Sequence, residues 1–145
     1  MTIDPSCMYC TQDQRVTDLM ITVRPLRVST LYLFREQTHP GRCIVAFNQG
    51  HIGNLFDLSE AQRAELMEDL SAASAAIQKV FSPDKINTAA FGDKVPHIHF
   101  HLVPKYKDGV NWGGTFEMMP ADKKLLTDSD YQDVIQQLKA ALNHY

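Results

Sequence analysis

The segment Pro96-His97-Ile98-His99-Phe100-His101-Leu102-Val103-Pro104 alternates histidines with apolar residues. Side chains alternate between the two faces of a β-strand, so a strand over 96–104 places its three inner apolar residues on one face. His97, His99 and His101 then share the opposite face, about 6.6–6.8 Å apart along the strand. The sequence therefore predicts a strand that packs on a core and presents three imidazoles on its other face.

Three neighbouring imidazoles suit phosphoryl chemistry, because histidine changes charge near neutral pH. Adjacent imidazolium ions repel one another, so at most one or two of the three are charged together. Such an array offers a neutral nucleophile beside N–H donors that stabilise developing negative charge. His-x-His on a strand also binds zinc or iron, and an exposed strand face can carry histidines without a function. The residues alone leave the nucleophile and the metal site open.

The rest of the chain predicts an α+β fold in which helices cover one face of an antiparallel sheet of about five strands. Ser59, followed by Gln62 at capping-box spacing, begins a long central helix with an apolar stripe, and Pro83 ends it. A second amphipathic helix runs from about residue 130 to the C-terminus. The strands preceding the histidine segment are predicted at 19–24, 30–34, 43–47 and 85–91.

The size and charge of the chain set its class. We expect 145 residues to form a single domain, 1–145. A net charge of −3 does not suit a nucleic-acid clamp, and no apolar run approaches a membrane span, so we expect neither partner. No signal peptide is visible, and three cysteines are too few for a disulfide scaffold, which together predict a cytoplasmic protein.

Cys7-Met8-Tyr9-Cys10 is a C-x₂-C pair near the N-terminus. Two thiolates at this spacing can supply half of a tetrahedral zinc site. The alternatives are a loose pair of thiols and a redox motif, although no βαβ unit accompanies the pair. Cys43 lies in an apolar segment and is expected to be an inert buried thiol.

His97 to Val103 resembles the signature of the histidine-triad family, and the order of the surrounding segments is similar over roughly residues 7–118. The resemblance implies a nucleotide hydrolase or transferase that acts on the α-phosphate of dinucleoside polyphosphates or nucleoside phosphoramidates. His99 would attack phosphorus and form a nucleotidyl-histidine, His101 would bond the phosphate or the bridging atom, and His97 would orient the site. Family members are usually homodimers. The alternative is a nucleotide-binding or zinc-stabilised interaction module with little turnover.

A structural zinc is also implied by the resemblance, because some members of the family carry one. Its ligands would be Cys7, Cys10, His51 and His97. A closed site with four protein ligands has no open position for water, so this zinc would stabilise the fold rather than activate a nucleophile.

Four further residues are candidate substrate contacts through the same resemblance. Asn87 would reach phosphate or ribose, unless its amide bonds to backbone at a strand edge. Glu36 stands near the position of an acidic residue that binds ribose. Asp93 and Lys94 replace a glutamine followed by serine or threonine, and Lys94 offers a positive charge to a polyphosphate unless both are solvated turn residues.

Overall fold

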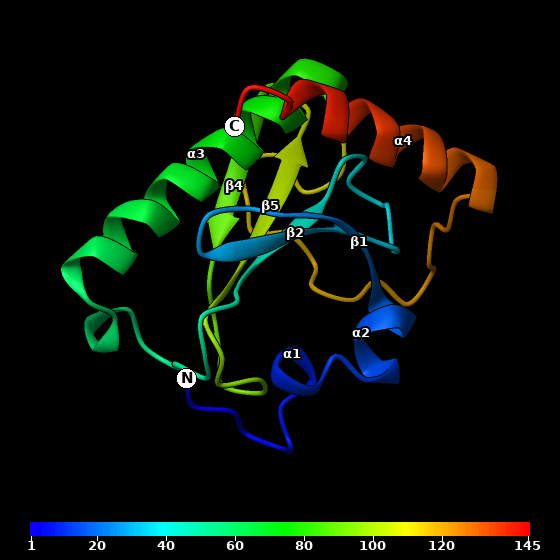
Figure 1. The fold of residues 1–145 in the computed structure, drawn as a ribbon. Coiled ribbons are helices and arrows are strands. Elements are labelled where there is room, and N and C mark those ends of the chain that lie inside the picture. The colour runs from blue at the N-terminus through cyan, green and yellow to red at the C-terminus, as the bar shows by residue number, and fades with distance from the viewer.

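Five antiparallel strands form the sheet at the centre of the protein, in the order β1-β2-β3-β5-β4 (Figure 1). The computed structural model describes all residues from 1 to 145. The strands are β1 (Met20–Pro25), β2 (Ser29–Phe34), β3 (Cys43–Phe47), β4 (Lys85–Ala89) and β5 (His99–Lys105). The histidine strand β5 lies between β3 and the edge strand β4, so both of its edges are paired. The predicted α+β fold with its antiparallel sheet is confirmed.

The predicted strand over 96–104 begins three residues later than expected, at His99. The backbone N–H of Ile98 donates to the carbonyl of Ile52, in the loop after β3, and the carbonyl of Ile98 accepts from Phe47. The bond from Phe47 continues the pairing with β3, but the bond to Ile52 ties the N–H of Ile98 to the loop, so the regular strand begins only at His99. The alternation of faces holds, because Ile98 and Leu102 lie in the main core while the histidines face the other way.

Two long helices cover one face of the sheet, α3 (Glu60–Phe81) and α4 (Asp128–Ala141) (Figure 1). The expected capping box is present, since Ser59 accepts from the Gln62 backbone and the Gln62 side chain accepts from Ser59. Leu66, Leu70, Ala73 and Ile77 of α3 are buried against the sheet. Burial of these side chains stabilises the packing of α3 on the sheet.

The opposite face of the sheet is covered in part by two short helices that the sequence did not predict. They are α1 (Met8–Thr11) and α2 (Gln14–Leu19), and their length is too short for a helical period to register. Tyr9 and Val16 pack there in a second core with Tyr32, Phe34 and Ile44 of the sheet. A 3₁₀ turn, η1 (Leu55–Asp57), precedes α3. No helix is both long and apolar enough to cross a membrane.

Candidate active site and metal centre

The rings of His97 and His99 hydrogen-bond to backbone carbonyls, and these contacts decide which nitrogen carries the proton. Nε2 of His97 lies 2.7 Å from the carbonyl oxygen of Phe47, and Nδ1 of His99 lies 2.7 Å from that of His97. A carbonyl only accepts, so each of these nitrogens bears a hydrogen. Burial lowers the pKa of both histidines, which favours their neutral forms. The remaining nitrogen of each ring, Nδ1 of His97 and Nε2 of His99, then holds a free lone pair.

His101 has the opposite arrangement, because its partner is an arginine. Nη2 of Arg42 lies 3.2 Å from Nδ1 of His101, and a guanidinium has donors only. Nδ1 of His101 therefore accepts, and the ring proton is on Nε2. Burial, followed by the positive charge of Arg42 and the repulsion that a protonated His99 would exert, lowers the pKa of His101 to about 3. His101 is a neutral N–H donor at neutral pH.

His99 and His101 line a cavity of about 890 Å³ on the face of the sheet that α1 covers in part. Their rings are 5.4 Å apart at an angle of 64°. Most of the wall is apolar, and it includes aromatic side chains that can stack on a flat ligand: Tyr9, Phe34, Phe91 and Phe116. Nε2 of His99 has no hydrogen-bond partner in the protein, and it is not fully buried, since Nε of Arg42 is the only fully buried side-chain nitrogen or oxygen without a partner. Because His99 lines the cavity, this nitrogen is accessible from it.

The predicted substrate contacts divide into two groups. Asn87, Asp93 and Lys94 line the cavity together with the histidines. Glu36 does not line it: the side chain is buried, and its oxygens accept from the backbone and hydroxyl of Thr38 and from the backbone of Lys124. The structure therefore brings three of the four residues to the histidine face, and Glu36 holds together two loops.

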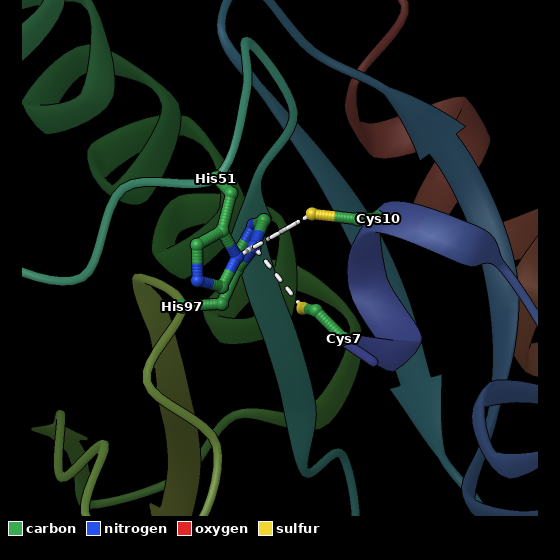
Figure 2. A group of neighbouring side chains, drawn as sticks. All are labelled: Cys7, Cys10, His51 and His97. Carbon is green, nitrogen blue, oxygen red and sulfur yellow. Dashed lines mark hydrogen bonds between the residues drawn. The ribbon is translucent and has the colours of Figure 1, made fainter. Parts of the chain in front are cut away.

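Cys7, Cys10, His51 and His97 meet beside this cavity, although they come from three separate parts of the chain (Figure 2). Cys7 and Cys10 lie at the two ends of the first turn of α1, and His51 follows β3. Nδ1 of His97 is 3.5 Å from Sγ of Cys7, 3.7 Å from Sγ of Cys10 and 3.4 Å from Nδ1 of His51. Nδ1 of His51 is 3.4 Å from Sγ of Cys10.

These four residues fit a tetrahedral zinc ion. Zn–S bonds of about 2.3 Å and Zn–N bonds of about 2.05 Å place tetrahedral ligand atoms about 3.3–3.8 Å apart, which matches the four distances given above. All four ligand atoms lie within 4.8 Å of one another. The hydrogen bond from His97 to Phe47 leaves Nδ1 as the free donor atom, the arrangement usual for ligating histidines. Nε2 of His51 lies 3.7 Å from a carboxylate oxygen of Asp4 on its other side. The cluster can hold a metal ion, and the four ligands would leave no coordination position for a substrate.

Sequence reasoning missed Arg42 and the segment that closes the cavity. Arg42 is fully buried just before β3. A charged residue ahead of an apolar strand is usually exposed, so its burial could not be predicted from the sequence. Gly114, Thr115 and Phe116 form part of the wall, and Nζ of Lys105 bonds the carbonyls of Asn111 and Gly114. Lys105 could have been flagged, because a lysine ends the buried strand β5.

The family model for the HIT domain matches residues 29–108 of this sequence. The chain belongs to the HIT family. Its HIT fold is similar to that of a histidine triad protein from Bradyrhizobium japonicum, with a TM-score of 0.80 and 23% identity over 90% of this chain and 96% of that one. A histidine triad protein from Marinobacter aquaeolei VT8 has a TM-score of 0.80 and 24% identity over 91% and 95% of the two chains.

A zinc-bound histidine triad family protein from Mycobacterium smegmatis also has this HIT fold, with a TM-score of 0.64 and 20% identity over 96% of this chain and 94% of that one. No curated protein sequence matches the chain. The TM-scores show a common fold, and the match to the HIT family model establishes membership. The expected resemblance is thereby confirmed.

Proposed function

We propose that this HIT protein is a nucleotidyl hydrolase or transferase that uses His99 as its nucleophile. The observation that carries the proposal is the hydrogen bond from Nδ1 of His99 to the carbonyl of His97, which directs the lone pair of the ring to Nε2. That atom is open to a cavity with aromatic walls, a size and lining that suit a nucleotide. His101 is beside it as a neutral N–H donor.

The reaction has two displacement steps at the α-phosphorus. In the first, Nε2 of His99 forms a bond to phosphorus while the bond to the leaving group breaks and that group takes the electron pair. The positive charge that develops on the His99 ring is stabilised by the carbonyl of His97, which accepts its Nδ1–H. In the second step water attacks phosphorus, the P–N bond returns its electron pair to Nε2, and the water proton leaves to solvent. An alcohol or phosphate in place of water makes the reaction a transfer.

The other polar residues of the cavity have roles in binding. The Nε2–H of His101 donates to a phosphate oxygen as negative charge develops there. Asn87 and Lys94 contact the phosphates, and Asp93 lies beside them. Zinc, held by Cys7, Cys10, His51 and His97, would supply structural cross-linking only. His97 then acts in the chemistry through its backbone carbonyl, because its ring belongs to the metal cluster.

Trapping of the intermediate tests the proposal. The protein is mixed with dinucleoside polyphosphates and nucleoside phosphoramidates labelled in the α-phosphate, quenched in alkali and digested, and the labelled peptide is identified. We expect label on His99 in the wild-type protein. His99→Ala should lose the label and at least about 10⁴-fold in kcat while it still binds the nucleotide. His144→Ala, at an exposed position, is the control.

Binding without product would favour the alternative, a nucleotide-binding module. Label on another residue, or normal turnover by His99→Ala, would contradict the proposed mechanism.

A further inference from the structure

We propose that Arg42 makes this site selective for phosphoric anhydrides over nucleoside phosphoramidates. Arg42 holds His101 in its neutral form, which donates a hydrogen bond but does not transfer its proton to a leaving amine. The inference rests on the proposed attack of His99 at an α-phosphate. It separates two substrate classes that the triad alone leaves equivalent.

The contact between Arg42 and His101 is built into the core of the protein. Nη1 of Arg42 donates to the carbonyl of Met118 at 2.8 Å, and Nη2 faces Nδ1 of His101 at 3.2 Å. The guanidinium carbon lies 4.2 Å from the ring centre of Phe34 and 5.2 Å from that of Phe116. A planar cation packed between two aromatic rings has little freedom to turn away. His101 cannot gain a proton on Nδ1 while this donor occupies that position.

The leaving groups of the two classes differ in their need for a proton. When Nε2 of His99 displaces a phosphate from an anhydride, the P–O bond breaks and the phosphate departs with the electron pair as a stable anion, since its second pKa is about 6. When the P–N bond of a phosphoramidate breaks, the nitrogen must gain a proton to depart as a neutral amine. A neutral His101 can donate a hydrogen bond to either group, but it does not transfer its Nε2 proton at neutral pH.

The other charged groups near His101 do not supply this acid. Arg42 lies behind the ring, and burial lowers the pKa of its guanidinium to about 10, an effect that the charge of Glu36 partly offsets, so Arg42 stays a cation and a donor at neutral pH. His99 is the nucleophile, and its single proton is on Nδ1, which donates to the carbonyl of His97. Asp93 and Lys94 line the cavity, but an ammonium is a far weaker acid than an imidazolium. The cavity therefore favours a leaving group that needs no proton.

The arrangement is costly for the fold, which argues for a role at the site. Nε of Arg42 is the one buried side-chain nitrogen or oxygen in the protein that lacks a hydrogen-bond partner. An unpaired buried donor on a desolvated cation destabilises a protein, and an apolar residue of similar volume would avoid that cost.

A matched pair of substrates tests the selectivity. One is a nucleoside monophosphate joined to methyl phosphate through an anhydride, and the other is the N-methyl amide of the same nucleoside monophosphate. Both are prepared with adenosine, guanosine, uridine and cytidine. For the preferred nucleoside we expect the wild-type kcat/KM for the anhydride to exceed that for the amide by at least about 100-fold, the usual contribution of a general acid. Values within tenfold of each other would overturn the inference.

Two variants of Arg42 test whether the selectivity depends on a positive side chain that can only donate hydrogen bonds. Arg42→Lys keeps a positive group that can only donate, so the preference should persist. The amide of Arg42→Gln can also accept from a protonated Nδ1, so His101 can become an imidazolium. We expect the preference to shrink at least about tenfold in Arg42→Gln, with amide cleavage rising as the pH falls from 8 to 6. A folded Arg42→Gln protein with an unchanged ratio would contradict the inference.

Nitrogen NMR of the wild-type protein supplies a readout that needs neither activity nor an Arg42 variant. Long-range ¹⁵N–¹H spectra, assigned with His101→Gln, should show His101 protonated on Nε2 alone from pH 8 to pH 5. An imidazolium at pH 6 would overturn the role of Arg42. If the NMR result is as expected but no nucleotide labels His99, the proposed function fails and the selectivity with it, while the tautomer assignment stands.

Discussion

The carbonyl oxygen of His97 accepts a 2.7 Å hydrogen bond from Nδ1 of His99, so His97 belongs to both halves of the site. Its ring faces the thiols of Cys7 and Cys10, and its backbone fixes the tautomer of the candidate nucleophile. A residue held on both sides in this way would couple metal binding at the cluster to the position of His99.

Loss of a thiol ligand should therefore reduce both zinc content and activity. We expect about one zinc ion per wild-type chain by inductively coupled plasma mass spectrometry and little in Cys10→Ser. The variant should also lose about 10- to 100-fold in kcat/KM, because His97 is no longer fixed. Cys43→Ala is the control, since Cys43 lies in the main core and not in the cluster. Equal zinc in Cys10→Ser and wild type would contradict the assigned ligands.

The buried neutral His101 should make the protein less stable in acid. The pKa of His101 in the fold is lowered to about 3, against an ordinary value of 6.5, so between these pH values the unfolded chain binds a proton that the folded chain does not. Its effect is absent above pH 6.5 and grows as the pH falls, by at most about 1.4 kcal/mol per pH unit.

Urea unfolding of wild type and His101→Gln from pH 7 to pH 4 measures this effect. The free energy of unfolding should fall more steeply with acid in the wild-type protein than in the variant, whose amide oxygen can still accept from Arg42. His144→Gln, at an exposed position, should follow the wild-type curve. Parallel curves for wild type and His101→Gln would show that His101 is not held neutral.

Asp69 joins α3 to β2 and to the end of the chain, and its contacts predict a stability effect. It is fully buried on α3 and accepts from the hydroxyls of Ser29 and Tyr145, both at 2.6 Å, and from two backbone N–H groups. Tyr145→Phe removes one bond to a charged group, so we expect a loss of about 1.5–3 kcal/mol in urea unfolding at pH 7. Tyr106→Phe, whose hydroxyl contacts only carbonyls at 3.2 and 3.4 Å, should lose less. Equal losses would argue against a special role of Asp69.

Lys105 should affect substrate binding although it is outside the cavity. Its ammonium bonds the carbonyls of Asn111 at 2.7 Å and Gly114 at 2.6 Å, which positions the segment bearing Phe116. Lys105→Met should raise KM about tenfold with a smaller change in the rate of His99 labelling, as measured by single-turnover kinetics. Lys107→Met, on the exposed loop, should behave as wild type. An unchanged KM in a folded Lys105→Met protein would show that this segment does not bind substrate.

Local patterns in the sequence were enough to predict the elements that carry the site. The alternation over 96–104 predicts a half-apolar strand whatever its neighbours are, and the spacing of Ser59 and Gln62 predicts a helix start, because both depend on residues close together in the chain. The short helices α1 and α2 and the later start of β5 at His99 were not predictable in this way. They depend on packing against Tyr32 and on hydrogen bonds to Ile52, which are distant in sequence.

Residue order alone establishes which chemical groups are available: three alternating histidines, two cysteines separated by two residues, and, through the family resemblance, a link from His51 to them. The use of those groups depends on contacts that form only when the chain folds. Arg42 and His101 are 59 residues apart in the chain, and Glu36 bonds to the backbone of Lys124, 88 residues away. The proton position on an imidazole and the availability of a carboxylate depend on such partners, and folding chooses them by burying some groups together and leaving others at the cavity wall.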